Sequence, residues 1–181
     1  MTSLADKIVA IGASLDAAGV PHGFGGALAL AWCTQRARGT IDIDVNLFVD
    51  ATNAPAALAA LPVEVRRTDE DVRAAAETGQ VRLWWGTTPV DVFLDVTDFH
   101  REAAGRVRRE PFNGAQVPFL GCSDLAVFKA FFDRTKDWAD LEEMAAAGSL
   151  DVERVLGVLV RYLGADDHRV ARLREVAGPA A

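Results

Sequence analysis

The sequence predicts an α/β protein, of the α+β kind, in which a small mixed sheet flanked by helices precedes a C-terminal helical bundle. Short apolar segments with period-two alternation recur up to about residue 121, which is typical of half-buried strands. Beyond that point, apolar residues recur at helical spacing. We therefore expect two parts, residues 1–121 and residues 122–181. Half of the residues are hydrophobic, which suffices for a sizeable core.

Local signals give the order of elements in the first part. Ser3 is expected to cap a first helix, and Gly19 to end it. The next predicted segments are a strand at 22–25, a helix from Gly26, a strand at 41–50, a helix at 52–61, a strand at 63–67, a helix at 69–77, and strands at 81–85 and 90–96. Asn113-Gly114, between apolar segments 107–112 and 115–120, predicts a hairpin.

The second part carries helix signals only. Ser123 and Thr135 are expected to cap its first two helices, and Gly148 and Gly164 to mark helix ends. Apolar residues at helical spacing predict two more helices, one from Val152 to Leu163 and one around residues 170–176.

The chain shows no sign of a membrane or of secretion. No apolar stretch is long enough to span a membrane, and the N-terminal residues do not form a signal peptide, so we expect a cytoplasmic protein with no membrane partner. Cys33 and Cys122 lack metal-like spacing. We expect them to be reduced thiols, with a Cys33–Cys122 bridge as the alternative.

Three aspartates in two predicted strands indicate a metal site. Asp42 and Asp44 share a face of the strand at 41–50, and Asp91 lies on one face of the strand at 90–96. Like charges so close repel each other, and Mg²⁺ or Mn²⁺ between the carboxylates would remove that cost. If the strands are neighbours, the three can hold two metals for attack on phosphorus. The alternative is a solvated acidic face.

Gly25-Gly26 lies between the predicted strand at 22–25 and the helix that follows. Glycines at such a turn let backbone N–H groups approach a phosphate, and the N-terminus of a helix favours an anion. A Gly pair at this place is also a common tight turn, so it supports the metal site without defining it.

Two blocks of sequence resemble minimal nucleotidyltransferases of the polymerase-beta superfamily, and most nearly the AbiEii-like toxins of bacterial toxin–antitoxin systems. The first block is Gly25-Gly26 followed by Arg38-Gly39-Thr40-Ile41-Asp42-Ile43-Asp44. The second block is Ser123-Asp124-Leu125, Lys129, and Arg134-Thr135-Lys136-Asp137-Trp138-Ala139-Asp140-Leu141.

The resemblance implies a nucleotidyltransferase-type sheet in a catalytic domain, and a helical bundle at 122–181 that completes the active-site face. The catalytic residues it implies are Asp42, Asp44, Asp91, Lys129 and Asp137, of which the first three bind metal. The nucleotide-binding residues it implies are Gly25, Gly26, Arg38, Thr40, Lys129, Arg134 and Lys136. It further implies a toxin that adds a nucleotide from a nucleoside triphosphate to the 3′ end of tRNA, with a cognate antitoxin protein as partner.

Several alternatives stay open. Lys129 could form only a surface ion pair with Asp133, and Asp137 could be only a favourable acid in the first turn of a helix. Trp84-Trp85 could stack a base or belong to the core.

The acceptor is also open. The net charge of −7 argues mildly against binding of nucleic acid, whereas arginines gathered within residues 101–109 could grip phosphates. The same site could modify a protein or a small antibiotic, or the chain could be a non-catalytic nucleotide-binding module.

Overall fold

The computed structural model describes residues 2–178, which form two compact units. The first unit comprises residues 2–26 and 39–120, and the second comprises residues 27–38 and 121–178. Residues 27–38, which the sequence division assigned to the first part, group with the C-terminal helices. None of the described helices is both long and apolar enough to cross a membrane.

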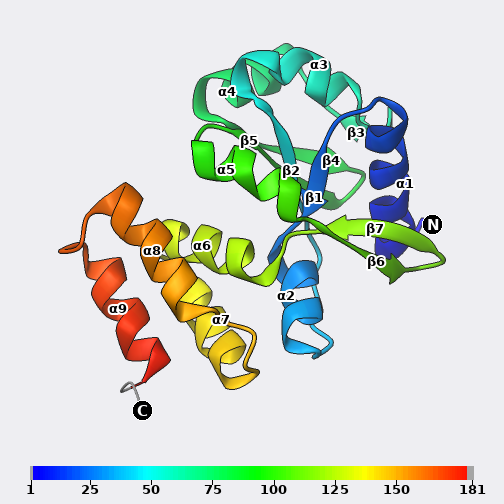
Figure 1. Cartoon of the computed structure of the whole chain (residues 1–181). Helices are drawn as coiled ribbons and strands as arrows, with labels where there is room; N and C mark the ends of the chain where they lie inside the picture. The colour runs from blue at the N-terminus through cyan, green and yellow to red at the C-terminus, as the bar shows by residue number, and fades with distance from the viewer. Residues whose placement is uncertain (1, 179–181) are drawn as a thin grey trace. The chain divides into compact units, whose positions relative to one another are not determined.

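The first unit is built on a seven-stranded mixed sheet with the order β3-β4-β5-β2-β1-β7-β6 (Figure 1). Its strands are β1 (His22–Phe24), β2 (Ile43–Asp50), β3 (Val65–Arg66), β4 (Gln80–Trp85), β5 (Thr88–Asp95), β6 (Arg108–Phe112) and β7 (Ala115–Phe119). The pairs β2·β5 and β1·β7 are parallel and the remaining pairs are antiparallel. The predicted mixed sheet is confirmed. The predicted first residue of the second strand is wrong, because Ile41 is exposed and precedes β2.

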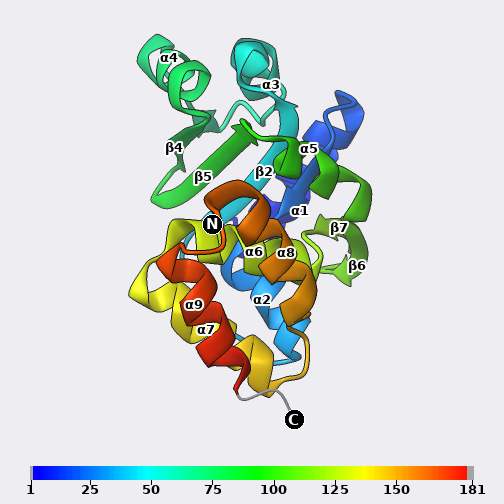
Figure 2. The same ribbon diagram turned by 60° about the vertical axis from the view of Figure 1, so that its left-hand side comes forward.

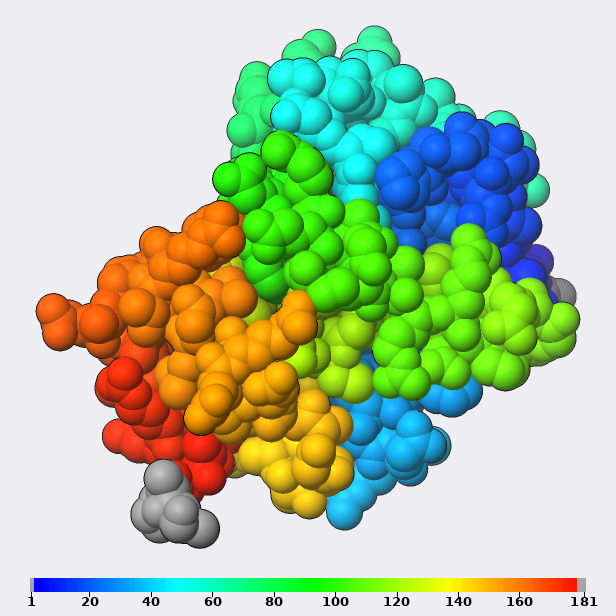
Figure 3. All heavy atoms as spheres, in the orientation of Figure 1, coloured from blue at the N-terminus to red at the C-terminus, as the bar shows by residue number. Residues whose placement is uncertain are grey.

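Helices of the first unit lie on both faces of the sheet. They are α1 (Leu4–Ala17), α3 (Ala54–Ala59), α4 (Asp69–Thr78) and α5 (Asp98–Ala103), with 3-10 turns at η1 (Ala51–Asn53) and η2 (Ala104–Arg106). Ser3 caps α1 as predicted, in a reciprocal capping box with Asp6. The hairpin of β6 and β7 lies beside α1 (Figure 3), joined to it by ion pairing between Arg109 and Asp16.

The two faces of the central strands differ in chemistry. On one face the apolar side chains of β2 and β5 are fully buried; these are Ile43, Val45, Leu47, Val90, Val92 and Leu94. The opposite face carries Asp44 and Asp91. α5 packs on that face where the strands end, since His100 contacts Phe48 edge-on and Arg101 donates to Asp95. α5, a helix of six residues, was not predicted.

The second unit is entirely helical (Figure 2). It holds α2 (Gly26–Thr34) beyond its first residue, α6 (Cys122–Phe132), α7 (Thr135–Ala146), α8 (Val152–Leu163) and α9 (His168–Ala177). The predicted caps Ser123 and Thr135 are wrong, because both residues lie inside their helices and the N-cap residues are Gly121 and Arg134. Cys33 and Cys122 form a disulfide that joins α2 to α6. The expectation of reduced thiols is therefore wrong, and the alternative of a Cys33–Cys122 bridge is correct.

Candidate active site

Asp44 and Asp91 lie side by side on neighbouring parallel strands. They are register partners in the β2·β5 pair, so their side chains leave the same face of the sheet. Both residues are partly exposed. The sequence predicted this adjacency only on condition that the two strands pair, and the structure meets that condition.

Asp91 is held by an arginine that the sequence analysis missed. Arg82 lies opposite Asp91 in the β4·β5 pair and donates from Nε and one Nη to the two carboxylate oxygens, at 2.7 Å each. The pKa of Arg82 is raised above its ordinary value, first by these hydrogen bonds and the charge of Asp91, and further by the charges of Asp42 and Asp44. Arg82 is therefore the local counter-charge for all three carboxylates.

Asp42 lies one residue before β2, where its carboxylate accepts a hydrogen bond from the Thr40 hydroxyl. Thr40 thus orients the segment that leads into the aspartates. Among residues 2–178, no group of three or more His, Cys, Asp and Glu side chains is arranged to ligate a metal. Asp44 and Asp91 lie together on the sheet, whereas Asp42 lies before β2, so the three carboxylates do not form one metal-ligating group.

The Gly pair differs in function between its two members. The Gly25 N–H donates to the Asp44 carbonyl oxygen at 2.9 Å, so this donor is engaged within the sheet. Gly26 has a φ of +55°, and a Cβ atom on it would lie 1.8 Å from a carboxylate oxygen of Asp44. A side chain there would strain the left-handed backbone and displace the Asp44 carboxylate, so the position favours glycine.

Substituting Gly26 should therefore disturb the carboxylates as well as the turn. We expect Gly26→Ala to lower the free energy of unfolding by about 1–2 kcal/mol through its left-handed backbone, and also to weaken Mn²⁺ binding by displacing Asp44. Urea unfolding and a Mn²⁺ titration measure the two effects. Gly86→Ala is the matched control, since Gly86 has a φ of +62° and nothing within 4 Å of the added atom. Equal Mn²⁺ affinity in both variants would contradict the close approach of Gly26 to Asp44.

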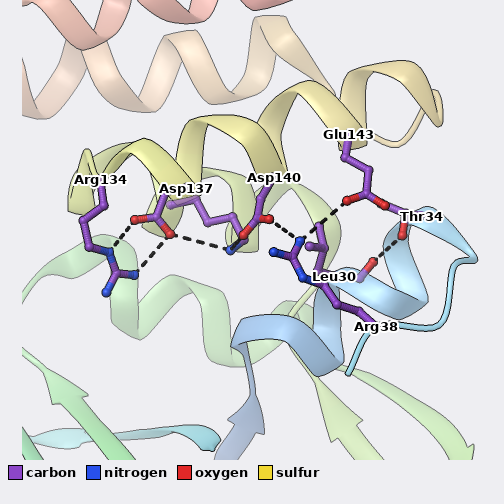
Figure 4. Close-up of polar contacts among 8 residues, drawn as sticks. Leu30, Thr34, Arg38, Arg134, Asp137, Asp140 and Glu143 are labelled. Atoms are coloured by element: carbon purple, nitrogen blue, oxygen red, sulfur yellow. Dashed lines mark hydrogen bonds and ion pairs between the residues drawn. The ribbon is translucent and has the colours of Figure 1, made fainter. Parts of the chain in front are cut away.

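In the second unit, four charged residues of the second sequence block, Lys129, Arg134, Asp137 and Asp140, form one network with Arg38 and Glu143 (Figure 4). Lys129 on α6 donates to Asp140 at 2.6 Å and lies 3.7 Å from Asp137, both on α7. Arg134 binds both oxygens of Asp137, at 2.6 and 3.1 Å. Arg38, after α2, pairs with Asp140 and lies 3.6 Å from Glu143.

Burial decides between the alternatives for these residues. Lys129, Asp137 and Asp140 are each at most 6% exposed, so Lys129 is no surface residue. The alternative of a surface ion pair with Asp133 is wrong, because the Asp133 carboxylate instead accepts from Trp138 and pairs with His168. Lys136 is exposed. Asp140, which the sequence analysis quoted in the motif but gave no role, is the residue that joins Lys129 to Arg38.

The arginines at 101–109 are largely neutralised within the first unit. Arg101 pairs with Asp95 and Asp98, Arg108 with Glu110, and Arg109 with Asp16. Arg106 lies over the ring of Phe99. The group is therefore less available to phosphates than its sequence suggests.

Arg82 and a divalent cation would compete for Asp91. We expect Arg82→Gln to raise the affinity for Mn²⁺, without nucleotide, about fivefold, because a partly exposed bidentate pair contributes about 1 kcal/mol. Isothermal titration with Mn²⁺ measures this. Arg108→Gln, which also removes an ion-paired arginine, should leave the affinity unchanged, and the same result for Arg82→Gln would contradict the competition.

Comparisons with known proteins identify the fold. No protein-family model matches the sequence, and no curated protein does. The solution structure of the antibiotic-resistance factor ANT(2'')-Ia aligns with a TM-score of 0.60 and 18% identity, over 94% of this chain and 95% of that one. Its crystal structure in complex with adenylyl-2''-tobramycin gives 0.59 and 17%, over 94% and 97%. An antigenic nucleotidyltransferase-like protein from Paracoccidioides brasiliensis gives 0.50 and 14%, over 93% and 91%. The chain has a nucleotidyltransferase-type fold, as predicted.

Proposed function

We propose that the protein is a metal-dependent nucleotidyltransferase, which moves a nucleoside monophosphate from a nucleoside triphosphate to an acceptor hydroxyl. The observation that carries the proposal is the pairing in register of Asp44 with Asp91, beside a turn at Gly26 that lies against the Asp44 carboxylate. The nucleotidyltransferase-type fold is consistent with this chemistry.

The carboxylates fit a divalent cation by their chemistry. The carboxylate oxygens of Asp42, Asp44 and Asp91 are hard donors, which Mg²⁺ and Mn²⁺ prefer. The negative charge of these three residues already stabilises one cation, the guanidinium of Arg82. Because the three carboxylates do not converge in this structure, binding requires Arg82 to release Asp91 and the carboxylates to draw together. When bound, the ion supplies neutralisation of phosphate charge and a lowered pKa of the acceptor hydroxyl.

The chain's own residues would then act as follows. The Gly26 turn lets the triphosphate approach Asp44, and Asp91 takes the proton of the acceptor hydroxyl. The acceptor oxygen forms a bond to the α-phosphorus while the bond to the bridging oxygen breaks, and pyrophosphate leaves with the electron pair. In the second unit, Lys129 holds Asp137 and Asp140 in place, and Arg134 orients Asp137. Direct contact of Lys129, Arg134, Lys136 or Arg38 with the triphosphate remains a prediction.

The first acceptor we propose is the 3′ end of an RNA such as tRNA, which follows from the two sequence blocks that resemble AbiEii-like toxins. A cognate antitoxin belongs to the same proposal. The arginines at 101–109 are mostly paired with carboxylates, so they add little support for an RNA acceptor.

The second candidate acceptor is a small antibiotic. It is supported by the alignment with ANT(2'')-Ia over nearly the whole of both chains, and by the net charge of −7, which attracts a polycation.

One experiment separates the candidates. The protein is incubated with Mg²⁺ and each α-labelled triphosphate in turn, together with total RNA, with an aminoglycoside such as tobramycin, or with neither. Released pyrophosphate and the labelled product are measured. Label on RNA supports the first acceptor and label on the antibiotic supports the second. If no combination of acceptor and triphosphate releases pyrophosphate, the proposed function is contradicted.

A further inference from the structure

An exposed tryptophan lies on the carboxylate face of the sheet. Trp84 follows Arg82 by two positions on β4, so both side chains leave the same face, about 7 Å apart along the strand. Arg82 in turn contacts Asp91. Although tryptophans of strands usually belong to the core, Trp84 is 42% exposed.

An arginine stands beside this ring. Arg66 is the register partner of Trp84 in the β3·β4 pair. The two side chains therefore leave the same face of the sheet as cross-strand neighbours. Arg66 is exposed, and its guanidinium has no hydrogen-bond or ion-pair partner among residues 2–178. It differs in this from Arg82 and from Arg101, Arg108 and Arg109, which all hold carboxylates.

Trp84 and Arg66 line an open cleft of about 720 Å³ at this edge of the sheet. Val63, 85% exposed, adds an apolar surface. Arg67 also lines the cleft, with its guanidinium donating to the carbonyls of Pro62 and Val65. The one lining carboxylate, Asp71, is engaged in the cap of α4. The cleft therefore offers an aromatic face and excess positive charge on an otherwise acidic chain.

The strand order separates this cleft from the Gly26 turn. β1, which leads into Gly26, lies on one side of β2, whereas β4 lies on the far side of β5. The carboxylates of Asp44 and Asp91 stand between them. If the triphosphate approaches at Gly26, the acceptor hydroxyl must reach Asp91 from the β4 side, where Trp84 and Arg66 are.

From this arrangement, and on the basis of the proposed function, we infer that the Trp84–Arg66 cleft binds the terminal nucleotide of an RNA acceptor. Its base stacks on Trp84 and its phosphate pairs with Arg66, so that the 3′-hydroxyl points to Asp91. A polycationic antibiotic would meet two arginines here, which opposes its binding in this cleft.

The test uses a short fluorescent single-stranded oligoribonucleotide and measures its affinity by anisotropy. Trp84→Ala should weaken binding about 5- to 150-fold, the loss that one base stack produces, whereas Trp84→Phe should retain most of the affinity. Arg66→Gln should lower the slope of log affinity against log salt by about 0.7, as expected for one lost phosphate contact. Arg73→Gln, which removes the same charge from the exposed surface of α4, should change neither quantity.

Thermal stabilisation by triphosphate and Mg²⁺ is measured on the same variants, and should match that of the unmodified protein. RNA affinity that is unchanged in both Trp84→Ala and Arg66→Gln would overturn the inference. The inference would also be overturned if Trp84→Ala and Arg66→Gln weakened the binding of tobramycin and left the binding of RNA unchanged. If RNA binding depends on Trp84 but no acceptor yields pyrophosphate, the cleft stands and the proposed function fails.

Discussion

Asp44→Ala should abolish nucleotidyl transfer while the protein remains folded. Asp44 stands beside Asp91 in register and under the Gly26 turn, so its loss removes the central member of the carboxylate group. We expect turnover to fall at least about 10²–10³-fold, the loss that follows removal of one preorganised electrostatic group. The residue is only partly buried, so the free energy of unfolding should change by less than about 1 kcal/mol.

Pyrophosphate release measures the turnover, and urea unfolding measures the stability. Asp69→Ala is the matched control, because it removes the same charge from the exposed first turn of α4. Stabilisation by Mg²⁺ and triphosphate should disappear in Asp44→Ala and persist in Asp69→Ala. Full activity in Asp44→Ala would contradict the assignment of the carboxylates.

The sequence predicts the elements of this fold better than their ends. Period-two alternation located β2, β4 and β5, and Asn113-Gly114 located the hairpin, because these signals are local. The caps of α6 and α7 were misplaced, since neither helix has a side-chain cap. The strand order and the grouping of residues 27–38 with the C-terminal helices depend on long-range packing, which no local pattern records.

The sequence also contains enough information to predict the Arg82–Asp91 pair of the candidate site. Arg82 faces Asp91 because Gly86-Thr87 forms a tight turn between β4 and β5, with Trp85 opposite Thr88. That turn and the alternation on either side were visible in the sequence, so the pair was predictable. The burial of Lys129 was not, because its charge and the nearby Asp133 suggest a surface residue. The exposure of Trp84 was not predictable either, because tryptophans of strands usually belong to the core.

Lys129→Met should strongly destabilise the second unit. Lys129 is buried between Asp137 and Asp140, and removing it leaves two buried carboxylates with less positive charge. Breaking a buried ion pair in this way typically costs about 3–5 kcal/mol. We expect the lower end, about 3 kcal/mol, because Asp137 keeps Arg134 and Asp140 keeps Arg38. Urea unfolding measures the loss.

The matched control is Lys136→Met, an exposed lysine on the same helix as the two aspartates, which should change the free energy of unfolding by less than about 0.5 kcal/mol. The double variant Lys129→Met/Asp140→Asn should recover part of the lost stability, because it also removes one of the buried charges. Titration with a non-hydrolysable triphosphate separates the two roles of Lys129. If Lys129→Met weakens triphosphate binding about tenfold or more with stability intact, the lysine contacts phosphate and does not serve mainly to hold Asp137 and Asp140.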